Sequence, residues 1–205
     1  MQGTDQAVEI VAGGAAIGTL RVAEGKISGF ILEDFGEAIK RGARIYAECL
    51  GYGIGGEAYH ITAPEPSGMR EARIIREAME ESRILPTEVD YINAHGTGTP
   101  LNDKVETLSI KNVFGERAYS IPVSSIKSSV GHCLGSAGAI EAIASVLSII
   151  YQFIPPTLTH REGDEDCDLD YVPGKSREAQ VRVVLSNSFA FGGNCTTLVF
   201  RKYFM

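Results

Sequence analysis

The strongest constraint on the fold is one continuous segment in the middle of the chain. An apolar stretch over residues 121–126 leads to Lys127, a Ser- and Gly-rich run that carries His132, and a largely apolar segment over 136–151. This order predicts a buried strand, a tight loop and a helix that is apolar on most sides. We expect the start of that helix in the interior, where its N–H groups and dipole suit an anion or a developing oxyanion. We interpret the segment as half of an active site.

A second segment of the same kind lies earlier in the chain. Residues 89–94 predict a strand that ends at His95, and Thr99 and Pro100 suit the N-cap and first position of a helix continuing to residue 114. In α/β sheets, ligands bind where parallel strands end. His95 by itself is equally compatible with a core histidine. Because the next strand delivers a lysine and another histidine to the equivalent place, we interpret the three side chains as a catalytic cluster.

The glycine-rich residues 51–56 predict a flexible turn after a strand over 45–50. A phosphate cradle is the alternative interpretation of these glycines. It is less favoured because the stretch lacks the third glycine of G-x-G-x-x-G, a helix that begins on it and a P-loop lysine. A helix with an apolar stripe is expected further on, over 67–84.

The two ends of the chain carry weaker signals. Near the N-terminus we expect a short strand over 7–12, a weakly patterned linker over 21–29 and a short helix over 34–41. The C-terminal part predicts a β-hairpin, whose strands over 181–185 and 195–203 flank a loop.

Two phenylalanines, Phe189 and Phe191, lie in the loop of that hairpin, next to a pair of glycines. Both are compatible with core packing or with a gate over a pocket. Composition favours the core, because phenylalanine is more often buried than exposed.

Composition excludes several classes of protein. A formal net charge of −7 without a Lys/Arg cluster argues against nucleic-acid binding. We expect no membrane span, since no window reaches roughly 18 consecutive apolar residues, and no secretory signal. The four cysteines are far apart and form no C-x-x-C pair, which favours free thiols over a zinc site or disulfides. A soluble protein of cytosolic type is therefore expected, with no metal.

Four motifs, in this order, resemble the C-terminal portion of a β-ketoacyl-acyl-carrier-protein synthase of the elongating Cys-His-His type. They lie at residues 93–103, 124–132, 167–173 and 186–193, within a similarity that is nearly continuous from Ala43 to Phe200. The resemblance implies the thiolase-like α/β fold, a mixed five-stranded sheet with helices on both faces. Residues 51–205 would form one βαβαβαββ half, and residues 1–50 a remnant of the other.

The resemblance also assigns roles to individual residues. His95 and His132 would bind the malonyl thioester carbonyl and promote decarboxylation, through neutral Nε2–H groups that donate to the enolate oxygen. Lys127 would hydrogen-bond near the second histidine. Glu106, in the helix after the first histidine motif, would order this lysine. Phe191 would gate the nucleophile, and its backbone N–H would contribute to the oxyanion hole.

Further expectations follow from the same resemblance. Phe189, Thr97 and Thr99 are supporting residues of the site. No cofactor is implied. The implied partners are acyl carrier protein and its malonyl and acyl thioesters, with a homo-oligomer or a pairing with another synthase chain. The implied compartment is the bacterial cytoplasm or an organellar stroma or matrix.

One departure from the family pattern concerns the nucleophile. The family places its acylated cysteine before an Ala-Gly-Gly strand, which corresponds here to residues 8–14, and none of the cysteines fits that place. Cys49 lies in a strand, Cys133 beside His132, Cys167 in an acidic loop and Cys195 where the family has Asn or Ala.

Two hypotheses of different class therefore remain. The first is a synthase that elongates fatty acids by decarboxylative Claisen condensation and here lacks its nucleophilic half. The second is an inactive truncated or degenerate fragment that acts as a scaffold or binding subunit. In either case we expect apolar surface that another segment normally covers.

Overall fold

The structure is a computed structural model, and it describes residues 7–12, 16–23, 26–27, 31–56, 58–161 and 165–204. Within this part of the chain, one large mixed sheet has the strand order β3-β2-β4-β1-β5-β11-β10-β6-β7. A separate two-stranded ribbon pairs β8 (Phe153–Ile154) with β9 (Arg177–Glu178).

Five neighbouring strands of the large sheet form the expected mixed half. They are β5 (Glu48–Gly56), β11 (Asn194–Arg201), β10 (Val183–Ala190), β6 (Tyr91–Asn93) and β7 (Val123–Ser124). Strands β10, β6 and β7 are parallel, whereas β11 runs antiparallel to both β10 and β5. The prediction of a mixed five-stranded sheet is confirmed.

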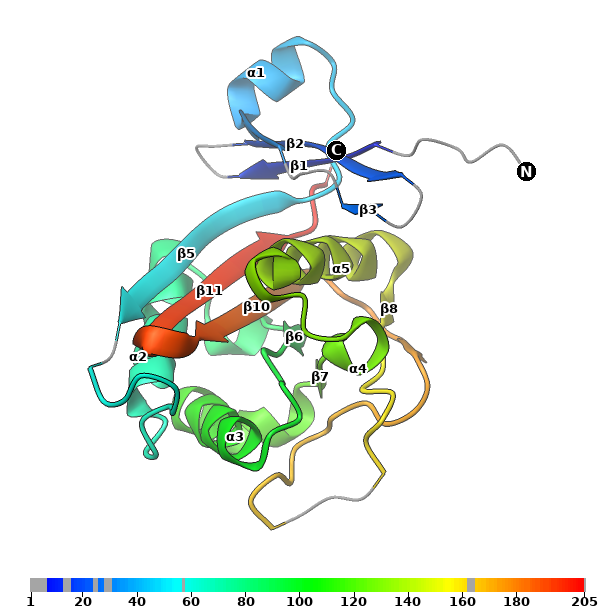
Figure 1. Ribbon diagram of the computed structural model, residues 1–205. Coiled ribbons are helices and arrows are strands. Elements are labelled where there is room, and N and C mark those ends of the chain that lie inside the picture. Colours follow the sequence, from blue (N-terminus) through cyan, green and yellow to red (C-terminus); the bar gives the residue numbers. More distant parts are fainter. Residues whose placement is uncertain are drawn as a thin grey trace.

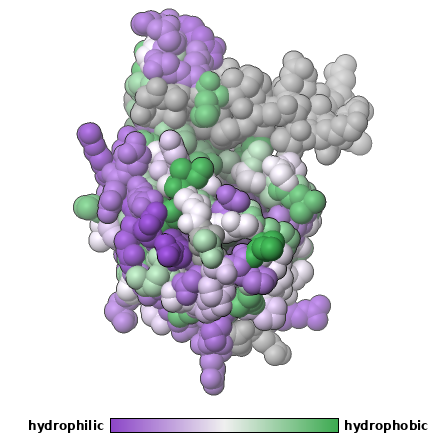
Figure 2. Space-filling model, turned by 60° about the vertical axis from the view of Figure 1, so that its left-hand side comes forward, coloured by the Kyte–Doolittle hydropathy of each residue, from purple (hydrophilic) through white to green (hydrophobic). Residues whose placement is uncertain are grey.

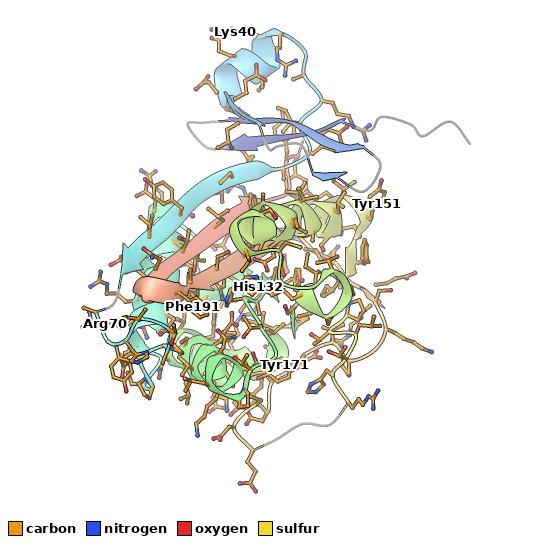
Figure 3. All side chains as sticks on the ribbon, viewed as in Figure 1. Lys40, Arg70, His132, Tyr151, Tyr171 and Phe191 are labelled. Carbon is orange, nitrogen blue, oxygen red and sulfur yellow. The ribbon has the colours of Figure 1, made fainter. Side chains whose placement is uncertain are left out.

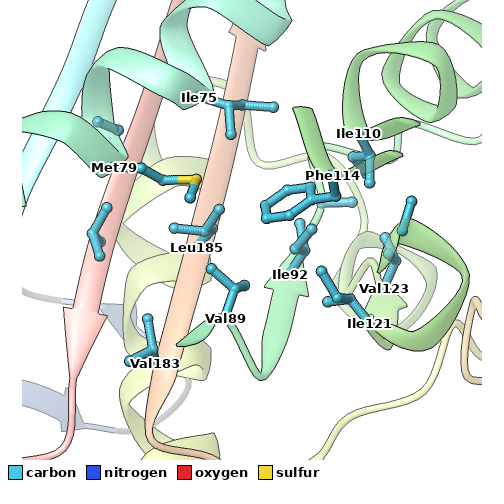
Figure 4. Packing of buried hydrophobic residues seen from close by; sticks show 14 of the residues in the cluster. Ile75, Met79, Val89, Ile92, Ile110, Phe114, Ile121, Val123, Val183 and Leu185 are labelled. Carbon is cyan, nitrogen blue, oxygen red and sulfur yellow. The ribbon is translucent and has the colours of Figure 1, made fainter. Parts of the chain in front are cut away.

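Helices cover both faces of this half (Figure 1). Helices α2 (Met69–Glu81) and α3 (Pro100–Phe114) pack on one face, and α5 (Ala137–Tyr151) packs on the other. The strands divide their side chains accordingly, because successive residues point to opposite faces. Ile92 and Leu185 belong to the core under α2 and α3, where they meet Ile75 and Phe114 (Figure 4).

The opposite core lies under α5. The neighbouring strand residues Tyr91 and Val184 turn to this side, where they meet Val146 and Ile149. By length and composition alone, Leu134–Tyr151 is apolar enough to cross a membrane, a test that core helices of soluble proteins also pass. Since α5 buries its residues against the sheet, we describe it as a core helix.

The N-terminal elements extend the sheet beyond β5. They comprise β1 (Ala7–Ala12), β2 (Ala16–Ala23), β3 (Lys26–Ile27), β4 (Ile31–Asp34) and α1 (Phe35–Lys40). The predicted strand over 7–12 and the short helix, capped by Asp34, are confirmed. The predicted linker over 21–29 is wrong where β2 and β3 run through it, and its residues 24, 25, 28 and 29 lie outside the described part.

The predicted turn at 51–56 is also wrong, because these residues continue strand β5. The glycines instead let α2 lie directly on the strand. A Cβ atom on Gly53 would stand 2.2 Å from the carbonyl oxygen of Ile74, and one on Gly51 would stand 2.7 Å from Ser82 Oγ. Such distances exclude any side chain, so close packing between strand and helix accounts for this pattern.

The C-terminal hairpin is confirmed, and its first strand continues further than expected. Strand β10 reaches Ala190 and β11 begins at Asn194, so only Phe191–Gly193 forms the connection. The polar stretch assigned to a loop is strand because its side chains find partners inside the protein. Asn187, for example, accepts a hydrogen bond from Thr197 Oγ1 at 2.9 Å.

Candidate active site

Two histidines meet at the ends of neighbouring strands. His95 follows β6, and His132 follows β7 and the short helix α4 (Lys127–Val130). Their rings stand edge to face, with centroids 5.5 Å apart and planes at 84°. His95 is buried and His132 is exposed. In Figure 3, His132 lies below the start of α5. The structure thus brings together the two histidines that the sequence analysis singled out.

Lys127 belongs to the same cluster but does not make the contact that was expected. Its Nζ atom lies 3.3 Å from Nδ1 of His95 and donates to the His95 carbonyl oxygen at 2.5 Å. It also forms a buried ion pair with Glu141. The expected hydrogen bond near the second histidine is therefore corrected to one with the first, because the lysine turns inward toward the buried carboxylate.

Glu106 acts on the backbone of the first histidine motif. From α3, its two carboxylate oxygens accept hydrogen bonds from the N–H of His95 at 2.9 Å and the N–H of Gly96 at 2.8 Å. Asn187 Nδ2 donates to the same carboxylate at 3.2 Å. We expected Glu106 to order Lys127. Its hydrogen bonds instead fix the strand end that carries His95, and the lysine acts on it through charge.

Both imidazoles are held neutral. Burial, followed by the charges of Lys127 and His132, lowers the pKa of His95 to about 3. Burial and Lys127 also lower the pKa of His132. A neutral ring at physiological pH carries one N–H, and which nitrogen holds it depends on the partners of the other.

Those partners favour Nε2–H in both rings. Lys127 has only donors to offer, so Nδ1 of His95 accepts. Nδ1 of His132 accepts from the backbone N–H of Leu134 at 3.1 Å. The proton of each neutral ring is thereby assigned to Nε2, and two N–H donors are available in one place.

Glu141 is a site residue that the sequence reasoning missed. Its carboxylate pairs with Lys127 and accepts from Ser188 Oγ at 3.4 Å, while its backbone carbonyl accepts from Asn93 Nδ2 at 2.8 Å. Burial raises the pKa of its carboxyl, and the lysine opposes that effect. The available signal was a single acidic residue in a helix that is otherwise apolar, since a buried carboxylate requires a cationic partner.

The two phenylalanines of the hairpin have different surroundings. Phe189 is buried against Ile74 and Cys195, and its ring centroid lies 5.8 Å from that of His95. Phe191 is 73% exposed at the tip of the hairpin, where it is labelled in Figure 3. The interpretation as core is therefore confirmed for Phe189 and wrong for Phe191. The turn is tied to a neighbouring loop, because Gly192 N–H donates to the Ile61 carbonyl at 2.7 Å.

The two threonines of the first histidine motif lie at the start of α3. Their hydroxyl oxygens are 2.9 Å apart, and α3 begins at Pro100 as predicted. Thr99 occupies the N-cap position without a side-chain cap bond. A cavity of about 740 Å³ opens beside Thr97, Lys127 and His132.

The start of α5 is not in the interior, contrary to the prediction. Residues 134–136 are exposed, Leu134 to 77%, and burial of the helix begins at Ala137. The buried cluster beneath α5 combines residues of the large sheet with Ile154, Val172 and Val181, and it includes no residue of the loop before the helix. Apolar surface is thus exposed next to the two histidines.

The four cysteines, all of which the structure describes, have surroundings of different kinds. Burial raises the pKa of the Cys49 thiol to about 11. Cys133 Sγ donates to the carbonyls of Val130 and Gly131. Cys195 is buried beside Phe189, and Cys167 Sγ lies 3.7 Å from the hydroxyl of Thr107.

Comparisons with known sequences agree with this arrangement. Residues 46–161 match the family described as the C-terminal domain of beta-ketoacyl synthase. A 3-oxoacyl-(acyl-carrier-protein) synthase 2 of Synechocystis sp. is 53% identical over 173 residues, 84% of this chain and 42% of that protein. Its counterpart in Coxiella burnetii is 47% identical over 174 residues, 85% of this chain and 42% of that protein.

Solved structures give the same result. A type II polyketide ketosynthase in complex with its acyl-carrier protein superimposes with a TM-score of 0.83 at 42% identity, over 85% of this chain and 43% of that chain. A beta-ketoacyl synthase from Burkholderia phymatum gives 0.80 at 39% identity, over 85% and 42%. These neighbours have the thiolase-like fold that the motifs implied, which confirms that expectation.

Proposed function

Because the chain belongs to the beta-ketoacyl synthase family, we propose that it supplies the malonyl side of a decarboxylating Claisen condensation in fatty-acid elongation. The observation that carries the proposal is the pair of neutral histidines, His95 and His132, 5.5 Å apart between ring centroids. The chain spans about 42% of the length of the curated relatives named above, and their names support the reaction class.

The proposed step uses the two Nε2–H groups as donors to one oxygen. The thioester carbonyl of a malonyl group accepts from both rings. The bond between Cα and the carboxylate breaks, carbon dioxide leaves, and the electron pair moves into an enolate whose oxygen the two N–H groups stabilise. Because both rings stay neutral, neither protonates the enolate carbon, which remains a nucleophile.

The second half of the reaction requires an acyl thioester. The enolate carbon attacks the acyl carbonyl, a carbon–carbon bond forms, and the thiolate leaves. We propose that none of the four cysteines described above is the acylated nucleophile. Another polypeptide segment supplies that cysteine. Two features support this: their thiols are engaged elsewhere, and His132 and Leu134 are exposed beside the site. Phe191, at the hairpin tip, is then the gate above that thiolate.

The proposed partners are acyl carrier protein with its malonyl and acyl thioesters, and a second synthase chain. Support comes from neighbours solved as a ketosynthase with its acyl-carrier protein and as a ketosynthase with a chain length factor. The named relatives are bacterial, which favours a bacterial cytoplasm over an organelle.

Release of carbon dioxide from malonyl carrier protein tests the proposal. The wild-type chain should release it faster than the His95→Ala, His132→Ala double variant, and His60→Ala is the matched control in an exposed loop. Wild-type release at the rate of the double variant would overturn the proposal. If such a chain still bound malonyl carrier protein, the scaffold hypothesis would replace it.

A further inference from the structure

The two histidines of the site lie on separate segments, residues 95–98 and residues 125–132, which we call the first and second histidine segments. Ser125 lies where they touch, and it is buried. Its hydroxyl donates to the carbonyl oxygen of Gly96, the residue after His95, at 2.8 Å. This hydrogen bond therefore ties the backbone beside one histidine to the segment that carries the other.

The two histidine segments are also in close contact at this bond. A Cβ atom added to Gly96 would stand 2.4 Å from Cβ of Ser125, closer than two side-chain carbons can approach. Gly96 has a φ of +42°, in the left-handed region that favours glycine. Because of the contact, the segments have no room to move closer together, and the hydrogen bond opposes their moving apart.

Ser125 is itself anchored by its neighbours. Its N–H donates to Thr157 Oγ1 at 3.2 Å, and its carbonyl oxygen accepts from Ser128 Oγ at 2.8 Å. Ser128 Oγ in turn accepts from the N–H of Leu158 at 2.8 Å. The position of the Ser125 hydroxyl is thus set by the second histidine segment and by the residues after β8, so the hydroxyl can hold the first segment in place.

The surface beside the site is open in the part of the chain that is described. His132, Leu134 and Phe191 are exposed. Figure 2, which brings the side of the hairpin tip forward, shows hydrophobic residues exposed among hydrophilic ones. The contacts that fix the two rings relative to each other therefore come from the inside of the molecule, where Ser125 lies.

We propose that Ser125 is a positioning residue, whose hydrogen bond to the Gly96 carbonyl sets the separation of the His95 and His132 rings. The inference rests on the proposed function, in which both rings donate to one oxygen. Two donors can reach the same acceptor only over a narrow range of separations, because hydrogen bonds weaken beyond about 3.2 Å. The enolate oxygen carries more charge than the thioester carbonyl, so a misplaced ring costs more in the transition state than in substrate binding.

The rate of carbon dioxide release from malonyl carrier protein by the full 205-residue chain tests the effect on the reaction. Ser125→Ala should lower kcat about tenfold, because small misplacements of reacting groups are costly, and should leave KM within about twofold of the wild type. Ser148→Ala is the matched control, since Ser148 is another buried serine whose hydroxyl donates to a backbone carbonyl, that of Ala144, at 2.9 Å. A kcat for Ser125→Ala no lower than that of this control would overturn the proposal.

Proton NMR of the folded proteins needs no substrate and so separates this proposal from the proposed function. The wild type should show a nuclear Overhauser effect between the rings of His95 and His132, and Ser125→Ala should weaken it. The pKa of His95 should rise in the variant, because the ring loses part of its burial and lies further from Lys127. Wild-type values of both in folded Ser125→Ala would overturn the positioning role. The expected NMR changes in a chain that releases no carbon dioxide would refute the proposed function and support the role of Ser125 in ring spacing.

A second variant decides the question if circular dichroism shows that Ser125→Ala does not fold. Thr157→Val removes the acceptor of the Ser125 N–H and keeps the Ser125 hydroxyl. It should lower kcat and weaken the contact between the rings in the same direction, by a smaller factor. A folded Thr157→Val chain with wild-type kcat and an unchanged ring contact would overturn the proposal.

Discussion

Lys127 and Glu141 form an ion pair whose side chains are 5% and 2% exposed, directly behind His95. The lysine is the first residue of the short helix α4, and the glutamate belongs to the core helix α5. The same ammonium group reaches Nδ1 of His95, so the pair links the tautomer of the imidazole to the packing of α5 on the sheet. A buried ion pair is costly unless additional hydrogen bonds compensate both charges. Here the Lys127 ammonium also donates to the His95 carbonyl, and the Glu141 carboxylate also accepts from Ser188 Oγ.

Removal of one member of this pair should destabilise the protein strongly. Lys127→Met leaves the buried Glu141 carboxylate without its cation, and we expect a loss of about 3–5 kcal/mol in the free energy of unfolding. Lys127→Met combined with Glu141→Leu should be much closer to the wild type, since no uncompensated charge remains. Urea unfolding of the three proteins measures this. A double variant as unstable as the single one contradicts the explanation.

The stability of the fold should depend on pH through His95. Its pKa in the folded protein is about 3, below the ordinary value of 6.5, so between these values the unfolded chain binds more protons. The free energy of unfolding should therefore fall as the pH is lowered from about 6.5 toward 3, by at most about 1.4 kcal/mol per pH unit from this group. His95→Gln should lose this contribution, and identical pH profiles for the two proteins would argue against a buried neutral ring.

Gly53→Ala should destabilise the protein because strand β5 has no room for a side chain beneath α2. The added Cβ would meet the Ile74 carbonyl at 2.2 Å, and overpacking of this kind costs about 1–3 kcal/mol. Gly56→Ala is the matched control, since its Cβ would lie in ordinary van der Waals contact, 3.9 Å from the Gly193 carbonyl oxygen. Thermal unfolding of both variants checks the prediction, and equal melting temperatures would count against the close strand–helix contact.

Glu106→Gln should impair both stability and decarboxylation. One amide oxygen cannot replace two carboxylate oxygens, so either the His95 or the Gly96 N–H loses its acceptor. An unsatisfied buried donor costs about 1–3 kcal/mol, and a displaced strand end misplaces His95. The free energy of unfolding and the rate of carbon dioxide release should fall together. A variant with wild-type values for both would show that Glu106 does not position this histidine.

Sequence patterns predicted the site best where the determining signals are local. The positions of His95, Lys127 and His132 follow from strand ends and glycine-rich loops, and the start of α3 follows from Pro100. The wrong prediction at 51–56 concerned a contact between elements. Glycine is typical of turns, and only the packing of α2 on β5 shows why the strand needs it.

The partner of Lys127 was missed for a related reason. Glu141 lies 14 residues further along the chain, on a different element, and their contact depends on how α5 crosses the sheet. Which of the two phenylalanines is buried likewise depends on where the hairpin turns, because Phe189 faces His95 inside β10 and Phe191 begins the turn. Such relationships are set by tertiary packing, which spacing along the sequence does not encode.

The most direct test of the central claim is nitrogen-15 NMR of the two imidazole rings at neutral pH. We expect His95 and His132 to be both neutral with the proton on Nε2, and His95 to stay neutral well below pH 6.5. A cationic ring at pH 7, or a proton on Nδ1 of either histidine, would contradict the claim that this chain presents two neutral N–H donors to one oxygen.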